Sequence, residues 1–97
     1  MELKELQQQV TEFVRDKGWY KADSARPQVP RNLAISLCLE AAEVLEHFQW
    51  QEECDREEMA LELADVLHYV LQLADVLDID LEQAVMTKLA QNRERRW

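Results

Sequence analysis

The sequence predicts an all-α fold, a four-helix bundle formed by a single domain over residues 1–97. With one glycine and two prolines in 97 residues, the chain has few of the turn signals that many short strands would need. Apolar residues make up 47% of the chain and recur at helical spacing, which indicates amphipathic helices around a core. Asp55 and Asp80 precede Glu58 and Gln83 by three residues, the spacing of a helix capping box.

Each helix follows from its own apolar pattern. Residues 2–17 carry one apolar stripe, and Gly18, the only glycine, suits the end of that helix. The remaining helices are expected over residues 31–50, 55–77 and 81–95.

The segment 19–31 between the first two helices reads as a long loop that contains Trp19 and Tyr20. Loops of this length in compact domains are often functional. The alternative is that Trp19 only plugs one end of the bundle.

The two middle helices are apolar around most of their circumference, which two short outer helices cannot cover. We therefore expect a homo-oligomer, a dimer or a tetramer. Cys38 is expected to be a small core residue. In the last helix, four residues are expected to face inward: Leu81, Ala84, Val85 and Leu89.

Net charge is −9, which argues against binding a nucleic-acid polymer through the general surface. No apolar run has the length of a membrane span, so no membrane partner is expected. The first 15 residues carry charges throughout, unlike a signal peptide. The two cysteines provide no disulfide framework, and we expect a cytoplasmic protein.

Two acidic pairs interrupt the apolar middle helices: Glu40 with Glu43, and Glu62 with Asp65. Residues three apart share one face of a helix. If the helices pack side by side, four carboxylates converge and repel one another unless cations neutralise them. Hard oxygen ligands favour Mg²⁺, with Mn²⁺ as a substitute. The alternative is that both pairs simply form solvent-exposed faces.

Two histidines lie close to the acidic pairs. Asp65 and His68 have the acid-x-x-His spacing of di-iron carboxylate bundles, but no second Glu-x-x-His exists in the chain. We therefore expect His47 and His68 to be hydrogen-bonding or partly exposed residues and not metal ligands.

These motifs, in this order, resemble the MazG-like all-α nucleoside triphosphate pyrophosphohydrolases, and within them the small dCTP pyrophosphatase-like branch. The likeness covers about residues 10–97. It extends beyond the acidic pairs to four further segments: Pro30-Arg31-Asn32-Leu33, Phe48-Gln49-Trp50, Asp65 to Tyr69, and Asn92 to Arg96. The loop at 20–29 is longer than in that branch, and Val10 replaces a relative's histidine near the base. Both departures concern base specificity.

The resemblance implies a role for each matching position. The implied metal ligands are Glu40, Glu43, Glu62 and Asp65. Glu40 and Glu43 are also predicted to be catalytic, with Glu40 as the candidate that relays a proton from the attacking water. Trp19 and Trp50 correspond to aromatics that enclose the base. The residues that contact phosphate or sugar correspond to Tyr69, Lys88 and Asn92.

The predicted function is Mg²⁺-dependent hydrolysis of a (deoxy)nucleoside triphosphate to the monophosphate and pyrophosphate, for nucleotide-pool housecleaning. A dCTP-like pyrimidine nucleotide is the expected substrate. Such a reaction needs charge neutralisation and an activated water, which carboxylate-held metal supplies. The chain has no Gly-rich phosphate loop to do this with backbone amides. The alternative function is a non-catalytic helical interaction or regulatory module.

Overall fold

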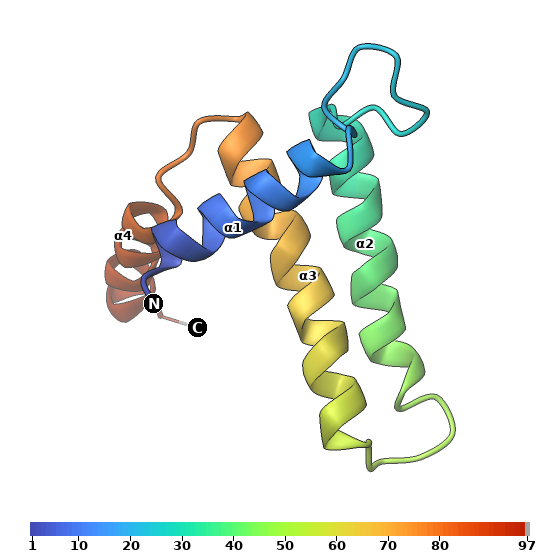
Figure 1. The fold of residues 1–97 in the computed structure, drawn as a ribbon. Helices are drawn as coiled ribbons and strands as arrows, with labels where there is room; N and C mark the ends of the chain where they lie inside the picture. The colour runs from blue at the N-terminus through green and yellow to red at the C-terminus, as the bar shows by residue number, and fades with distance from the viewer. Residues whose placement is uncertain (97) are drawn as a thin grey trace.

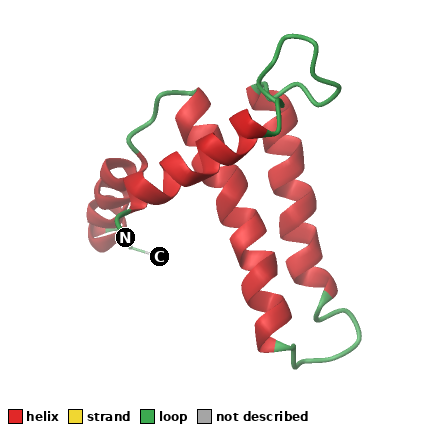
Figure 2. Ribbon diagram, in the orientation of Figure 1, coloured by secondary structure: helices red, strands yellow, loops and turns green. Residues whose placement is uncertain are grey.

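The computed structural model describes residues 1–96, and within them the chain forms α-helices and no strand (Figure 2), which confirms the predicted all-α fold. The helices are α1 (Leu3–Asp16), α2 (Pro30–Glu46), α3 (Arg56–Val76) and α4 (Leu81–Glu94). Helices α2 and α3 form a long antiparallel hairpin, and α1 crosses the C-terminal half of α3 (Figure 1). Helix α4 stands to one side of this arrangement.

Helix α1 ends in a way that fixes the position of Trp19. Gly18 has a φ of 74°, in the left-handed region that glycine adopts without steric penalty. Its backbone N–H donates to the Arg15 carbonyl, and the N–H of Trp19 donates to the Val14 carbonyl at 3.3 Å. These two bonds form a Schellman motif, so the chain turns sharply and places Trp19 beside the end of α1.

Helix α3 is capped as the sequence predicts. The Asp55 carboxylate accepts from the backbone N–H groups of Glu57 and Glu58 at 2.9 and 3.1 Å. The predicted cap of α4 is also present, because Asp80 accepts from the N–H of Gln83 at 3.1 Å. Two acidic side chains therefore satisfy amides that helix starts leave unpaired.

Helix α2 is shorter than predicted. It ends at Glu46, whereas the apolar pattern indicated a helix up to residue 50. The last bonds tighten to a spacing of three residues, with Phe48 N–H donating to Leu45 and Gln49 N–H to Glu46. Trp50 therefore lies in a connecting segment and has 89% of its surface exposed.

The core lies where α1 covers the hairpin. Its fully buried members come from α1, the start of α2 and the end of α3: Val14, Leu33, Leu71, Gln72 and Ala74. The Gln7 side chain of α1 also donates to the Leu71 carbonyl at 3.3 Å. This packing makes one end of the hairpin rigid, and the loop before α2 extends from that same end (Figure 1).

Two burial predictions are wrong for the chain by itself. Helix α4 has no buried residue; Leu81 is half-buried, and the other three predicted inward residues, Ala84, Val85 and Leu89, are exposed. Cys38 is also exposed. The face of α4 that carries these residues and the face of α2 that carries Cys38 have no covering element in the described part of the chain. Only the α1–α3 and α2–α3 pairs pack extensively there.

The unpacked faces are strongly apolar. Large aliphatic side chains remain exposed on both α2 and α3: Ile35, Leu39, Leu45, Leu61, Leu63 and Leu67. None of the four helices in residues 1–96 combines the length and the apolar character that a membrane span requires.

Candidate metal centre and nucleotide pocket

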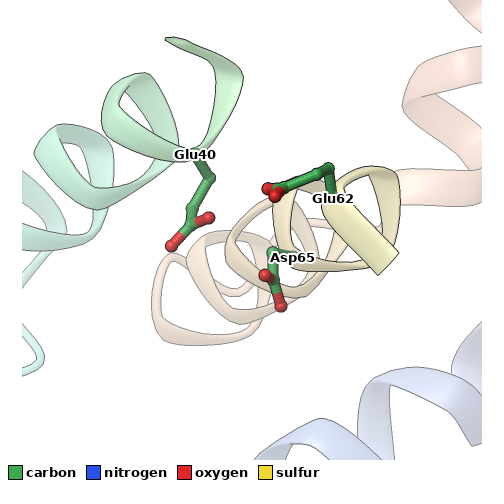
Figure 3. Close-up of side chains that lie close together, drawn as sticks. All are labelled: Glu40, Glu62 and Asp65. Atoms are coloured by element: carbon green, nitrogen blue, oxygen red, sulfur yellow. The ribbon is translucent and has the colours of Figure 1, made fainter. Parts of the chain in front are cut away.

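Three of the four predicted metal ligands come together between α2 and α3. Glu40, Glu62 and Asp65 each place one carboxylate oxygen within 4.8 Å of the others. Glu40 points from α2 toward the two side chains on α3 (Figure 3). The packing of α2 against α3 brings these residues together, because Glu40 on α2 faces the side of α3 that carries Glu62 and Asp65.

The cluster is electrostatically strained. Partial burial, followed by the charges of Glu43, Asp65 and Glu62, raises the pKa of the Glu40 carboxyl above its usual range. Neighbouring like charges disfavour ionisation in this way unless a cation offsets them. The same charges that raise this pKa would therefore favour binding of a divalent ion.

Two carboxylate oxygens at the seam have no hydrogen-bond partner. Oε2 of Glu40 and Oε2 of Glu62 are buried and accept no hydrogen bond from the described residues. A buried acceptor without a partner is costly, and oxygen-rich clusters suit Mg²⁺ and Mn²⁺. The donor set therefore fits a hard divalent cation.

Glu43 lies at the edge of this cluster. Its side chain is exposed and does not belong to the group of three, although its charge acts on Glu40. On the other side, Nε2 of His47 lies 3.4 Å from Oε1 of Glu62. His68 hydrogen-bonds to Gln72 at 3.1 Å, as expected for a hydrogen-bonding histidine, and burial lowers the pKa of its ring.

A cavity of about 250 Å³ lies next to the cluster, beneath the loop that precedes α2. It contains two of the predicted substrate-binding residues, Trp19 and Tyr69. Phe13 packs edge-on against the Trp19 ring, with centroids 5.8 Å apart, and the Arg26 guanidinium lies 5.7 Å from the ring centroid. Trp19 therefore forms a wall of a cavity, which favours the functional interpretation of its loop.

The cavity and the carboxylates are neighbours along both helices. Ser36 lines the cavity and precedes Glu40 by four residues on α2. Tyr69 lines the cavity and follows Asp65 by four residues on α3. Four residues of helix rise by roughly 6 Å, so one helical turn separates the cavity from the acidic seam on each side.

Several cavity residues were not predicted as site residues: Arg26, Gln28, Asn32 and Ser36. The sequence carries a signal for the two that lie on α2, because Asn32 and Ser36 precede Glu40 by two turns and one turn on the same face. Arg26 and Gln28 belong to the loop, where no periodicity indicates which side chains face inward.

Three predicted substrate-binding residues lie away from the cavity. Trp50 is exposed in the connection after α2, and Lys88 is exposed on α4. Asn92 also lies on α4, and its Oδ1 is buried without a hydrogen-bond partner in residues 1–96. Helix α4 does not pack extensively on α2 or α3, so a single chain leaves these residues apart from the acidic seam.

A larger cavity of about 690 Å³ lies elsewhere, between α1 and the turn that joins α3 to α4. It contains none of the predicted site residues. The predicted site residues that line a cavity, Trp19 and Tyr69, therefore belong to the smaller of these two cavities.

The sequence profile of the MazG-like family matches residues 35–96, which include both acidic pairs and α4. This chain belongs to the MazG-like family. The family predicted from the motifs is thereby confirmed. The matched region contains all four predicted metal ligands.

Named relatives of this MazG-like chain are nucleotide hydrolases. It is 34% identical over 103 residues to dCTP pyrophosphatase 1 of Mus musculus, a match that covers 96% of this chain and 58% of the relative. The chain therefore spans little more than half the length of that relative. A dATP/dGTP diphosphohydrolase of Cyanophage S-2L is 49% identical over 43 residues, or 44% of this chain and 41% of the phage protein.

A solved structure supports the same grouping. A pyrophosphatase from Archaeoglobus fulgidus DSM 4304 superposes on this MazG-like chain with a TM-score of 0.76 and 37% sequence identity. The match covers 93% of this chain and 87% of the archaeal one. The arrangement of helices described above is therefore shared with a protein named as a pyrophosphatase.

Proposed function

We propose that this MazG-like chain is a divalent-metal-dependent nucleoside triphosphate pyrophosphohydrolase that cleaves between the α- and β-phosphates. One observation carries the proposal: a seam of clustered carboxylates with unpartnered oxygens lies one helical turn from an aromatic cavity. The names of the relatives, dCTP pyrophosphatase 1 and dATP/dGTP diphosphohydrolase, support the reaction class.

In this proposal the two parts of the site divide the nucleotide between them. The base enters the cavity and stacks on Trp19, an interaction that aromatic side chains offer to any base. The sugar lies between Ser36 and Tyr69, and the triphosphate extends along the seam toward Glu40. This arrangement brings the α-phosphate to the carboxylates, where water would attack.

Glu40, Glu43, Glu62 and Asp65 are the proposed ligands of Mg²⁺, for which Mn²⁺ would substitute. The bound ion supplies positive charge against the phosphates and makes an attacking water more acidic. Glu40 is the proposed proton acceptor, because its raised pKa brings it closer to the range in which a carboxylate can take up a proton at neutral pH. Glu43, at the edge of the cluster, adds a further ligand and further negative charge.

The active assembly is proposed to be a homo-oligomer, either a dimer or a tetramer. Leu39, Leu45 and Leu61 expose more than half of their surfaces on the hairpin, next to the acidic seam. A second copy would cover them and could bring its own α4, with Lys88 and Asn92, toward the phosphates. In this arrangement the buried but unpartnered Oδ1 of Asn92 would find a hydrogen-bond donor.

Base preference follows from the cavity and is proposed to be dCTP-like. Relatives of this chain carry names with both pyrimidine and purine substrates, so membership of the family does not by itself fix the base. The proposed cellular role is removal of unwanted nucleotides from the cytoplasmic pool.

The decisive experiment is hydrolysis of a panel of dNTPs by the purified chain with Mg²⁺ in ¹⁸O-labelled water, with mass analysis of both products. Attack at the α-phosphorus puts the label in the monophosphate and leaves pyrophosphate unlabelled. Glu62→Gln should lower kcat/KM by roughly 10³-fold, because loss of a metal ligand removes several kcal/mol of transition-state stabilisation.

Glu57→Gln is the matched control for that variant. It makes the same change on the same helix, at an exposed position in the first turn of α3, and should leave the rate unchanged. Release of orthophosphate and a diphosphate would contradict attack at the α-phosphorus. If no nucleotide is hydrolysed with either metal, the non-catalytic interaction module becomes the better explanation.

A further inference from the structure

Gln72 is the one polar side chain that is fully buried in the described part of the chain, with 0% of its surface exposed. It was not among the predicted site residues, although it follows Asp65 by seven residues and Tyr69 by three, on the same face of α3. A buried amide is unfavourable unless its donor and acceptor are both used. The partners of Gln72 therefore indicate why a glutamine occupies this position in the core.

The Gln72 amide is hydrogen-bonded at both ends. Its Nε2 donates to Oε1 of Gln28, which belongs to the loop before α2. Its Oε1 lies 3.1 Å from Nε2 of His68, one turn earlier on α3. Because this oxygen can only accept, the His68 nitrogen must carry the proton. The bond to Gln28 joins residues 44 positions apart in sequence and fastens the loop to α3.

The Gln28 side chain also binds the backbone of its own loop. With its Oε1 facing Gln72, its Nε2 donates to the Arg26 carbonyl at 2.6 Å. The three side chains His68, Gln72 and Gln28 thus form a hydrogen-bonded series in which each donor points toward the loop. We refer to it as the amide relay.

The loop backbone at the end of the amide relay forms one wall of the cavity. Arg26, Pro27 and Gln28 all line it, and the Arg26 guanidinium lies over Trp19 on the same side. Two further bonds shape this segment: Ser24 Oγ accepts from the Arg26 N–H, and Asn32 donates to the Pro27 carbonyl, each at 3.0 Å. Both of these bonds are exposed to solvent, so the half-buried bond to Gln72 is the stronger restraint against opening.

We propose that Gln72 is a positioning residue for substrate binding, which acts through Gln28 to hold residues 26–28 as a preformed wall of the cavity. This inference rests on the proposed function, because it takes the cavity to be the nucleotide's base site. A preformed wall removes the cost of ordering the loop when a ligand binds. The apparent affinity for the nucleotide is proportional to the fraction of molecules in which that wall is formed, so it falls when this fraction falls.

The test uses the full chain and three variants: Gln28→Met, Gln72→Met and the double variant. Methionine keeps the length of the side chain and removes the amide. Gln9→Met is the matched control, because Gln9 is an exposed glutamine on α1 outside both cavities. Hydrogen exchange of the backbone amides of residues 22–29 reports the loop, and steady-state kinetics with dCTP and Mg²⁺ separates KM from kcat.

Each single variant should speed exchange in residues 22–29 and raise KM roughly tenfold, as expected if the wall is formed in about a tenth of the molecules. The kcat should stay within about twofold, because the acidic seam is unchanged. The double variant should resemble the single variants, since both substitutions break the same contact, whereas independent effects would multiply.

Loop exchange that does not change in Gln28→Met would overturn the inference. So would a Gln72→Met protein that loses protection evenly over all helices while Gln28→Met behaves as wild type, because Gln72 would then act only in core packing. If the wild-type chain hydrolyses no nucleotide, the proposed function fails and the assignment to substrate binding fails with it. The exchange data would still decide independently whether Gln72 holds the loop.

Discussion

The α2–α3 hairpin has two halves that differ in how completely the chain covers them. The covered half, residues 30–36 and 66–76, lies under α1 and the loop and contains every fully buried residue of the hairpin. The open half, residues 37–46 and 56–65, contains none and exposes leucines on both helices. The acidic seam belongs to the open half and the cavity to the covered half.

This difference separates two physical requirements of the site. The cavity needs rigid walls, which the core around Leu33 and Leu71 provides within a single chain. The proposed metal site would bind a cation more strongly in a partly dry surrounding, where the charges of the carboxylates are less screened. In one chain the seam is only partly shielded, so a second copy over the open half would strengthen its electrostatics.

The largest expected effect contrasts leucines from the two halves. Leu71→Ala, at a position 1% exposed, should lower the free energy of unfolding by about 2–5 kcal/mol at any protein concentration, because it leaves a cavity in the core. Leu61→Ala, at a position 70% exposed, should matter only where copies associate. Denaturant unfolding at two protein concentrations checks both. Equal losses that do not depend on concentration would remove the distinction between the halves.

Metal should stabilise the open half in particular. At 100 times its Kd, a bound ion adds about 2.7 kcal/mol to the free energy of unfolding. Millimolar Mg²⁺ should therefore raise Tm, whereas NaCl at equal ionic strength should not. Thermal unfolding of wild type and Glu62→Gln, each with and without Mg²⁺, tests this. A Glu62→Gln variant that keeps the full Mg²⁺-induced rise in Tm would argue against Glu62 as a ligand.

The two tryptophans predicted to contact the base, Trp19 and Trp50, also differ between the two halves of the hairpin. Trp19 lines the cavity in the covered half, and its loss should raise KM by the equivalent of about 1–3 kcal/mol of stacking. Trp50 follows the open half and is exposed in one chain, so Trp50→Ala should raise KM only in the assembled protein. Steady-state kinetics at protein concentrations above and below the assembly midpoint tests this. An effect of Trp50 in the monomer would place it at the cavity.

The smallest expected effect is a pH dependence at Glu40. Its raised pKa means that the folded state holds this proton more tightly than the unfolded state does, so stability falls as pH rises from the usual carboxyl pKa through the folded value. In the presence of a chelator, Glu40→Gln should therefore be more stable than wild type at pH 7 and equal to it at low pH. Urea titrations at both pH values measure this, and a destabilised variant at pH 7 would indicate a structural bond at Glu40.

Local rules in the sequence account for most of the secondary structure. Asp55 and Asp80 start helices because their carboxylates accept hydrogen bonds from backbone N–H groups of the first turn. Gly18 ends a helix because glycine adopts a positive φ without steric penalty. The end of α2 was placed four residues too late, since no glycine or proline marks it and the bonds that end it depend on the path of the following connection.

The sequence by itself determined the acidic pairs and their faces, because helix periodicity places residues three apart on one side. Only the tertiary structure decided that Glu40, Glu62 and Asp65 share one seam, with Glu43 at its edge, because that depends on how α2 and α3 pack. It also decided the contact of Gln72 with Gln28, because Gln28 lies in a loop without periodicity and the bond joins residues that no local rule relates. The sequence also did not determine where α4 lies, because the apolar residues of α4 have no covering surface in the described part of one chain.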